Sequence, residues 1–189
     1  MRVIAGTHRG RRLRRPQGMG LRPTSDRVRE ALFSILGNRL PQCSFLDLYA
    51  GTGAIAIEAV SRGASHATCV ESGADALKLL RQNMLECGMA HCMTIQAQTV
   101  KQFLSRPDQW GGPYDIVFAD PPYALVGELP MLLNQTSLDR LCTADSWLIV
   151  EHAEKTALPS TLGTGVYLRG YRYGDTVLSL YSHSGTAQS

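Results

Sequence analysis

The 189-residue sequence lacks the patterns that mark several classes of protein. Its five cysteines are odd in number and show no CxxC pairing, so we expect reduced thiols and neither disulfides nor a zinc site. It has no apolar run of transmembrane length and no signal-peptide core. We therefore expect a soluble, cytoplasmic protein that needs no metal.

Acidic residues are scarce near the N-terminus. Residues 1–29 contain nine arginines and one acid, Asp26, although the whole chain has a formal net charge of only +3. A basic arm on an acidic body is typical of contact with a phosphate backbone, and a solvated basic face is the plainer alternative. The candidate contacts are Arg9, Arg11, Arg12, Arg14, Arg15, Arg22 and Arg27. Of these, Arg22 and Arg27, like Arg29, have a second interpretation as supports of the fold.

The sequence pattern predicts three segments. Residues 1–20 are expected to form a small basic β-ribbon arm, residues 21–184 the main domain, and residues 185–189 a flexible tail. From about residue 43, short apolar strands alternate with helices, which predicts an α/β fold with a mostly parallel sheet. The turn Gly174-Asp175 between two apolar runs predicts an antiparallel hairpin that closes the sheet.

Two helices are predicted with a buried stripe. The first begins near Ser25 and the second covers Ala74–Cys87, with Gly88 as the residue that ends it. The expected buried positions of the first helix are Val28, Ala31, Leu32, Ile35 and Leu36, with Arg29 off the stripe. Those of the second are Leu77, Leu80, Met84 and Cys87.

A glycine-rich turn follows the first strand of the alternating region. Glycines let the backbone approach a ligand closely, and doubly wound sheets bind ligands at the carboxyl ends of their strands. Glu71 ends the next strand about 20 residues later, where a carboxylate can accept both hydroxyls of a ribose. The candidate cofactor-binding residues here are Asp47, Tyr49, Ala50, Gly51, Gly53 and Glu71.

The glycine pattern argues against two common nucleotide sites. A P-loop requires GK[ST] after its glycines, and a dinucleotide site usually has a third glycine, and neither feature is present. A ligand with a ribose and no pyrophosphate fits better. S-adenosylmethionine, with S-adenosylhomocysteine as its product, is such a ligand, and a nicotinamide-dependent oxidoreductase is the alternative.

The segment Asp120-Pro121-Pro122-Tyr123, the DPPY motif, closes an apolar run and indicates a pocket for the exocyclic amine of a nucleobase. Such a nitrogen is a poor nucleophile because its lone pair is delocalised into the ring. A carboxylate and a proline-flanked carbonyl can accept hydrogen bonds from its two N–H groups, which leaves the lone pair pointing at a methyl donor. The prolines fix φ, and Tyr123 offers a flat face to an unstacked base. A proline turn with an exposed Tyr is the alternative.

Three segments occur in one order: RPTSDRVREALF at residues 22–33, the turn at 47–53 and the DPPY motif. Together they resemble the RsmD family of small-subunit (16S) ribosomal RNA guanine-N2 methyltransferases, and the resemblance covers nearly the whole chain. It implies a Rossmann-like class I S-adenosylmethionine-dependent methyltransferase fold with a seven-stranded sheet. It also implies methylation of the N2 amine of a specific guanine, with no metal.

The resemblance assigns roles to individual positions. In the family, the equivalents of Asp120 and Tyr123 belong to the catalytic motif. The equivalents that surround the cofactor are those of Asp47, Gly51, Gly53 and Glu71. Gln98 stands near a position where an Asp or Asn often contacts the adenine amino group, and we expect its side chain to accept that hydrogen bond.

Two other functions stay open at this point. An adenine-N6 or cytosine-N4 methyltransferase of DNA would use the same motif, although it would usually bring an added target-recognition domain. A non-catalytic RNA-binding assembly factor would keep the fold without the chemistry. We expect a monomer whose partner is small-subunit ribosomal RNA, free or assembled in the subunit.

Overall fold

The computed structural model describes residues 1–15 and 25–183. The predicted end of the arm at 16–20, Arg22 and the predicted tail at 185–189 lie outside these residues. The chain divides into two compact units, Met1–Thr99 and Val100–Ser189, which we call the first and the second unit.

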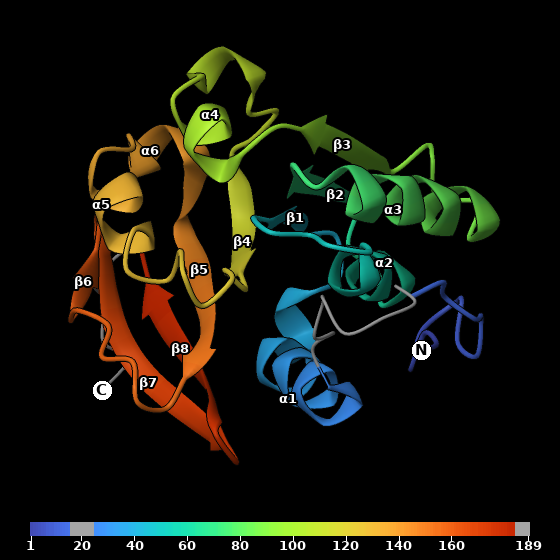
Figure 1. The fold of residues 1–189 in the computed structure, drawn as a ribbon, viewed down its shortest axis with the longest axis horizontal. Helices are drawn as coiled ribbons and strands as arrows, with labels where there is room; N and C mark the ends of the chain where they lie inside the picture. The colour runs from blue at the N-terminus through green and yellow to red at the C-terminus, as the bar shows by residue number, and fades with distance from the viewer. Residues whose placement is uncertain (16–24, 184–189) are drawn as a thin grey trace. The chain divides into compact units, whose positions relative to one another are not determined.

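Short parallel strands form the sheet of the first unit (Figure 1). They are β1 (Ser44–Asp47), β2 (His66–Glu71) and β3 (Met93–Ala97), and the helices that connect them are α2 (Ala54–Ser61) and α3 (Ala74–Glu86). β2 lies between the other two, with Asp47 beside Cys69 and Glu71 beside Ala97. Because the strands are parallel, their carboxyl ends meet at one edge, as the alternating sequence predicts.

Buried faces hold α2 and α3 against these strands. α2 is almost wholly buried and packs on β1 and β2. α3 buries the predicted Leu77 and Leu80, but the predicted stripe is wrong at Met84, which is only half-buried. Asn83, three residues after Leu80 on the same helix face, takes the buried position. The helix ends before Gly88, whose φ of +70° fits the predicted role.

The helix α1 (Asp26–Leu36) precedes β1 and continues into the 3-10 turn η1 (Gly37–Arg39). The hydroxyl of Ser25 accepts a hydrogen bond from the Val28 N–H at 3.2 Å and caps the helix, as predicted. The prediction that Arg29 lies off the buried stripe is wrong, because its side chain is 0% exposed. Phe33 is buried too, and the Arg62 guanidinium lies 4.8 Å from the centre of its ring.

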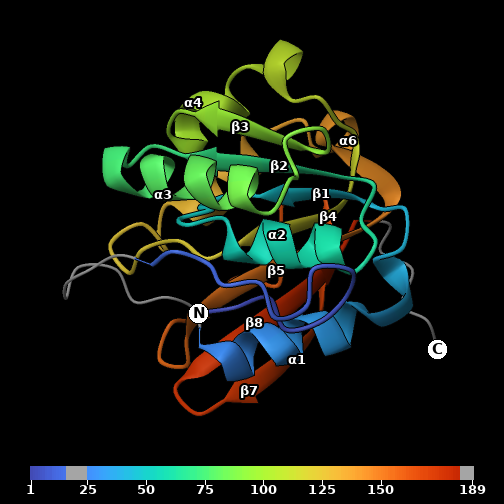
Figure 2. The ribbon, with the colours of Figure 1, turned by 90° about the vertical axis from the view of Figure 1, so that its right-hand side faces the viewer.

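The described part of the arm, residues 1–15, is a narrow antiparallel loop. An isolated bridge joins Arg2 to Arg12, and the Val3 N–H donates to the Arg11 carbonyl at 2.9 Å. Val3 and Leu13 are buried, whereas the arginines between positions 9 and 15 are exposed. Figure 2 shows this segment running beside α2.

The second unit starts with short helices and then forms a mixed sheet. Its elements are α4 (Val100–Leu104), η2 (Pro107–Gln109), β4 (Tyr114–Ala119), α5 (Leu129–Asn134), α6 (Leu138–Leu141), β5 (Cys142–Ala153), β6 (Thr161–Leu162), β7 (Gly165–Tyr173) and β8 (Thr176–Ser182). β4 and β5 are parallel, whereas β8 pairs antiparallel with both β5 and β7. The β7–β8 hairpin turns at Gly174, as predicted. The sequence pattern does not predict α5, α6 or the two-residue strand β6. With β6 the described residues contain eight strands, so the expected number of seven is wrong.

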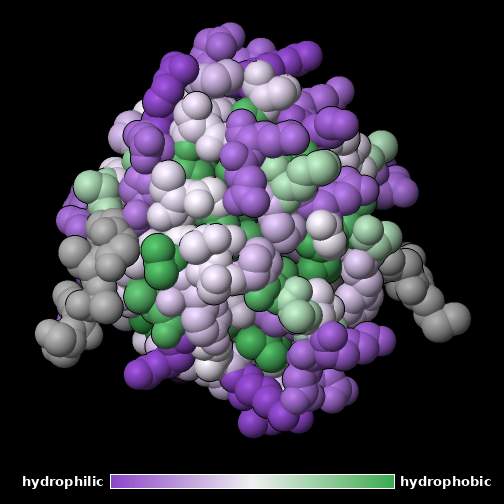
Figure 3. Space-filling model, turned by 90° about the vertical axis from the view of Figure 1, so that its left-hand side faces the viewer, coloured by the Kyte–Doolittle hydropathy of each residue, from purple (hydrophilic) through white to green (hydrophobic). Residues whose placement is uncertain are grey.

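Apolar side chains lie in small groups, separated by polar ones, on the face drawn in Figure 3. The exposed large apolar residues of the second unit include Met131, Val166 and Leu168. Scattered exposure of this kind is ordinary for a protein surface. Within the described ranges, no helix is both long enough and apolar enough to cross a bilayer.

Candidate active site

The glycine turn between β1 and α2 is fastened to β2. The Ala50 N–H donates to the Val70 carbonyl at 3.0 Å, and the Gly53 N–H donates to the Ala50 carbonyl at 2.7 Å. The Gly51 N–H donates to Oε2 of Glu71 at 2.8 Å. The structure therefore brings the predicted turn and the predicted ribose-binding carboxylate together.

The two glycines of the turn are needed for different reasons. Both have a positive φ, +54° at Gly51 and +78° at Gly53, which residues with a side chain rarely adopt. A Cβ at Gly53 would lie 2.2 Å from Cδ1 of Leu80, so this glycine lets α3 pack against the turn. A Cβ at Gly51 would meet no described heavy atom within 4 Å. Gly51 therefore borders open space in which a ligand can approach the backbone.

Backbone donors orient the carboxylate of Glu71. Its Oε1 accepts from the N–H groups of Ser72 and Gly73 at 2.8 and 2.7 Å, and its Oε2 accepts from Gly51. A carboxylate offers about four lone-pair positions, so these three bonds leave room for about one more. A ligand that donates two hydroxyls to Glu71 must therefore replace at least one backbone contact.

Asp47 and Tyr49 frame the start of the same turn. Asp47 is the last residue of β1 and is 1% exposed. Burial, and secondly the charge of Asp47, raise the pKa of the Cys69 thiol on β2 well above its ordinary value. Tyr49 is half-buried two residues further on. Both residues lie at or just after the carboxyl end of β1, where the sequence places candidate cofactor-binding residues.

Gln98 lies one residue beyond β3, at the same edge of the sheet. Its amide nitrogen donates to Oε1 of Gln96 at 3.2 Å. Glu71, the candidate for binding the ribose, pairs with Ala97 on the adjacent strand, and Gln98 directly follows Ala97. The edge of the first unit thus gathers the predicted residues from three strand ends.

The DPPY motif follows β4 directly in the second unit. Asp120 is partly buried and Pro121 is buried, whereas Pro122 and Tyr123 are exposed. Tyr123 is 70% exposed, which leaves most of its ring accessible to a partner. The motif therefore combines a carboxylate held close to the protein with an aromatic ring in solvent.

Glu151 is a further carboxylate near this motif, and the sequence analysis assigned it no role. Ala119 of β4 pairs in parallel with Val150 of β5, so Asp120 and Glu151 are the next residues on adjacent strands. Glu151 is only partly exposed. An acid that follows an apolar run was the signal that identified Glu71, and the same signal applies to Glu151.

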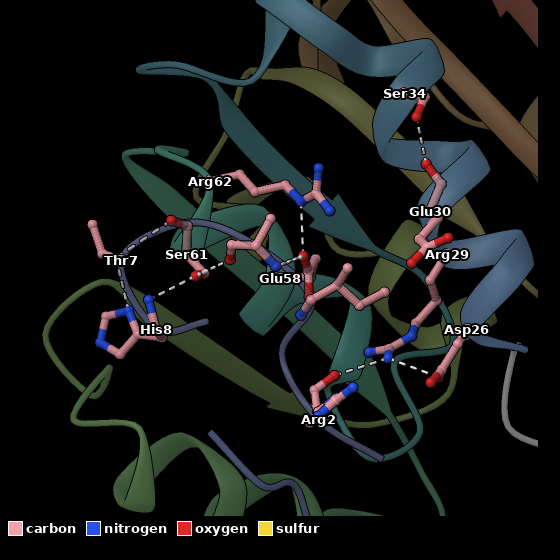
Figure 4. A network of polar contacts seen from close by, with 12 residues as sticks. Arg2, Thr7, His8, Asp26, Arg29, Glu30, Ser34, Glu58, Ser61 and Arg62 are labelled. Atoms are coloured by element: carbon pink, nitrogen blue, oxygen red, sulfur yellow. Dashed lines mark hydrogen bonds and ion pairs between the residues drawn. The ribbon is translucent and has the colours of Figure 1, made fainter. Parts of the chain in front are cut away.

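Glu58 of α2 binds the backbone of the arm, and no motif in the sequence predicts this role. Its side chain is 0% exposed. Its Oε2 accepts from the Ile4 N–H at 2.7 Å, and its Oε1 accepts from the Ala5 N–H at 2.9 Å and from Nε of Arg62 at 2.7 Å (Figure 4). A buried carboxylate is tolerated only with such partners. The visible signal was one acid in an otherwise apolar helix.

Ser61, near the end of α2, holds the next part of the arm (Figure 4). Its hydroxyl donates to the Ala5 carbonyl at 2.6 Å and accepts from the His8 N–H at 3.0 Å, and its carbonyl accepts from the Thr7 N–H at 2.8 Å. A Cβ at Gly6 would lie 1.8 Å from the Ser61 carbonyl oxygen. Only glycine permits this approach.

The candidate nucleic-acid contacts differ in their surroundings. Arg14 forms an ion pair with Glu86 at 2.6 Å, which raises the pKa of its guanidinium, and Arg11 donates to the Glu86 carbonyl at 2.7 Å. Within the described chain, the side chains of the others form no hydrogen bond or ion pair: Arg9, Arg12, Arg15 and Arg27. Exposed ion pairs contribute little to stability, so Arg14 too can exchange its partner for a phosphate.

Arg29 supports the fold. Its NH2 group donates to the carbonyl of Arg2 and to Oδ1 of Asp26, both at 2.9 Å (Figure 4). Complete burial and these two contacts tie the start of the arm to α1. Of its two interpretations in the sequence, the structural one is therefore favoured.

Comparison with known proteins identifies the family. Residues 1–182 match the model of the family described as Conserved hypothetical protein 95. The chain is 34% identical, over 191 aligned residues, to Ribosomal RNA small subunit methyltransferase D of Escherichia coli strain K12, and the match covers 100% of this chain and 93% of the relative. The chain belongs to the RsmD family.

Solved structures agree with this RsmD-family assignment. The Escherichia coli protein yhhF matches with a TM-score of 0.82 and 31% identity, over 96% of this chain and 97% of that protein. An RNA methyltransferase from Salinibacter ruber in complex with S-adenosyl-L-homocysteine has 13% identity and a TM-score of 0.61, over 87% and 95% of the two chains, which is a likeness of fold. The predicted Rossmann-like methyltransferase fold is confirmed.

Proposed function

We propose that this RsmD-family protein transfers a methyl group from S-adenosylmethionine to the exocyclic N2 amine of one guanine in small-subunit ribosomal RNA. The main support is the DPPY motif at the end of β4, in a chain that aligns along its whole length with a relative named Ribosomal RNA small subunit methyltransferase D. Family membership supports methylation of ribosomal RNA, and the choice of guanine N2 is the finer part of the proposal.

The first unit binds the methyl donor in this proposal. S-adenosylmethionine supplies a methyl group on a positively charged sulfur, which keeps the electron pair of the broken bond when the amine nitrogen takes the methyl carbon. Glu71 accepts the ribose hydroxyls, and Gly51 gives the ligand access to the backbone. Asp47 and Gln98 occupy the neighbouring strand ends, where they complete the cofactor edge.

The second unit orients the acceptor. The carboxylate of Asp120 and the carbonyl of Pro121 each accept a hydrogen bond from one N–H of the amine, so the nitrogen lone pair can face the methyl carbon. Asp120 takes up the proton that the amine loses as the new bond forms. Tyr123 stacks on the guanine ring after the base leaves its helical stack.

The arm holds the RNA. Arg9, Arg12 and Arg15 are exposed and contact phosphates, with Arg27 and Arg22 as further candidates and Arg11 and Arg14 joining when their contacts to Glu86 exchange. Residues 1–20 form the RNA-binding arm in this proposal, and residues 21–184 the methyltransferase domain. We expect the protein to act as a monomer in the cytoplasm, where ribosomal RNA is found.

The decisive experiment is methyl transfer from labelled S-adenosylmethionine to small ribosomal subunits isolated from cells that lack this protein, followed by nucleoside analysis. Label in N2-methylguanosine is the expected result. Subunits from cells that contain the protein serve as the control, because their target guanine is already methylated. Label in methyladenosine or methylcytidine would refute the choice of base. No transfer either to subunits or to protein-free ribosomal RNA, despite binding of S-adenosylhomocysteine, would refute ribosomal RNA as the substrate.

A further inference from the structure

One buried side chain joins the arm to the glycine turn. Asn83 of α3 is 0% exposed. Its Oδ1 accepts from the Arg14 N–H at 2.7 Å, and its Nδ2 donates to the Arg14 carbonyl at 3.1 Å and to the Thr52 carbonyl at 2.9 Å. Thr52 lies between the two glycines of the turn. A single amide therefore contacts an arginine of the arm and the middle of the candidate cofactor site.

The orientation of the Asn83 amide follows from its partners. The oxygen faces a backbone N–H, and the nitrogen faces two backbone carbonyls. Exchanging the two atoms would place a donor against a donor and an acceptor against two acceptors. Both N–H bonds of the amide are used, so no other polar side chain of this size satisfies all three contacts.

These contacts make the two regions depend on each other. The amide group of Asn83 is planar and rigid. If the Thr52 carbonyl moves and the amide rotates to keep its hydrogen bond, the amide atoms that contact Arg14 move as well. The Gly51 N–H next to Thr52 donates to Glu71, which extends the connection to the proposed ribose-binding carboxylate. On the other side, Arg12 lies two residues before Arg14 and Arg15 directly follows it, and both are exposed.

We propose that Asn83 is a positioning residue that couples RNA binding on the arm to cofactor binding in the glycine turn. RNA that binds Arg12 and Arg15 restrains the backbone of Arg14. The restrained backbone limits the motion of the Asn83 amide, and the amide in turn limits the motion of the Thr52 carbonyl. The turn then loses less conformational entropy when the cofactor binds. The coupling is reciprocal, because each ligand must change the affinity for the other by the same factor.

This inference rests on the proposed function, since it takes S-adenosylmethionine as the ligand of the turn and ribosomal RNA as the ligand of the arm. The test measures the dissociation constant of S-adenosylhomocysteine by calorimetry, without and with saturating small-subunit ribosomal RNA. We expect RNA to tighten binding about fivefold or more in the unchanged protein, the lower end of typical coupling. Failure of either ligand to bind would count against the proposed function. Binding of both with a ratio of one would overturn the role of Asn83.

Two substitutions isolate the contact. Asn83→Leu keeps the branching and the number of heavy atoms of the side chain and removes all three hydrogen bonds, so we expect the affinity ratio to fall to about one while both ligands still bind. Arg14→Ala removes the ion pair to Glu86 and leaves the backbone N–H and carbonyl that Asn83 holds. This control should weaken RNA binding and keep the ratio. A ratio that survives in Asn83→Leu would contradict the proposal.

Hydrogen exchange gives a second measurement in case Asn83→Leu does not fold. In the unchanged protein, S-adenosylhomocysteine should slow exchange of the Arg14 amide, whose hydrogen Asn83 holds, several-fold. The Thr7 amide, held by Ser61, is the control and should change little. Unchanged exchange at Arg14 in the presence of bound S-adenosylhomocysteine would refute the coupling.

Discussion

The first and second units present their candidate residues in opposite ways. In the first unit, Glu71 and the glycine turn are already fixed by backbone hydrogen bonds, and the buried Asn83 and Glu58 hold the arm from two sides. In the second unit, Tyr123 of the DPPY motif is 70% exposed. The proposed donor side thus has backbone contacts that partly order it without a ligand, whereas the proposed acceptor motif exposes the residue on which a base would stack.

This difference fits the partners that each side is proposed to bind. A small cofactor gains affinity from a partly preformed site, because less conformational entropy is lost on binding, and RNA on the arm reduces the remaining loss in the coupling proposed above. A base that must leave its stack requires an accessible aromatic face instead. The comparison therefore predicts that substitutions in the two units affect different measured quantities.

The largest expected effect is that of Asp120→Ala in the second unit. Removal of the carboxylate should lower kcat by about 1,000-fold, since it both orients the amine and accepts its proton. The dissociation constant of S-adenosylhomocysteine should stay unchanged. Asp108→Ala, which removes an exposed carboxylate of the same unit, is the control and should keep full activity. An equal loss of cofactor affinity in Asp120→Ala would break the division between the units.

The next effect separates the two glycines of the first unit. Gly53→Ala should lower the free energy of unfolding by about 3 kcal/mol. The alanine would have to keep the left-handed backbone conformation of Gly53, and its Cβ would clash with Leu80. Gly51→Ala should cost only about 1 to 2 kcal/mol, since its Cβ points into open space. The same Cβ should weaken S-adenosylhomocysteine binding at least about tenfold, the equivalent of about 1.4 kcal/mol.

Urea denaturation and calorimetry measure both quantities for the glycine pair. Each variant serves as the control for the other, because both place a methyl group at a positive φ in the same turn. An unchanged dissociation constant of S-adenosylhomocysteine in a folded Gly51→Ala variant would show that the ligand does not approach Gly51.

Glu58→Gln tests the attachment of the arm. The substitution removes a buried charge that pairs with Arg62, so we expect a loss of about 3 kcal/mol in the free energy of unfolding. Trypsin should also cleave the arginine-rich arm faster at 25 °C, since two backbone N–H contacts weaken. Glu30→Gln changes an exposed acid of α1 and should alter neither quantity. Unchanged cleavage in Glu58→Gln would mean that Val3 and Leu13 hold the arm without it.

The elements and strand-end residues that carry strong local patterns could be predicted. Alternating apolar strands and helices from about residue 43 predicted the parallel strands β1, β2 and β3, and Glu71 followed from the end of a strand. The short elements α5, α6 and β6 carry no such period and were not predicted. Local sequence therefore predicted the elements around the candidate cofactor edge better than the elements that follow the DPPY motif.

The residues that hold the arm could not be predicted, because their partners are distant in sequence. Asn83 contacts Arg14 across 69 residues, and Glu58 contacts Ala5 across 53. A polar residue in an apolar helix is visible in the sequence, as at Glu58, but its partner is not, and the burial of Arg29 was not predicted either. The roles of such residues become apparent only in the folded structure, which brings the distant segments together.

The smallest expected effect concerns Tyr123, the exposed ring of the acceptor motif. Stacking on one base contributes about 1 to 3 kcal/mol, so Tyr123→Ala should lower kcat/KM for the RNA about 10- to 100-fold. Tyr123→Phe keeps the flat ring and should stay within a few-fold of the unchanged protein. Because the side chain is 70% exposed, both variants should unfold at the same urea concentration as the unchanged protein. A loss in Tyr123→Phe as large as in Tyr123→Ala would assign the role to the hydroxyl, and the second unit would then hold the base by hydrogen bonding rather than by stacking.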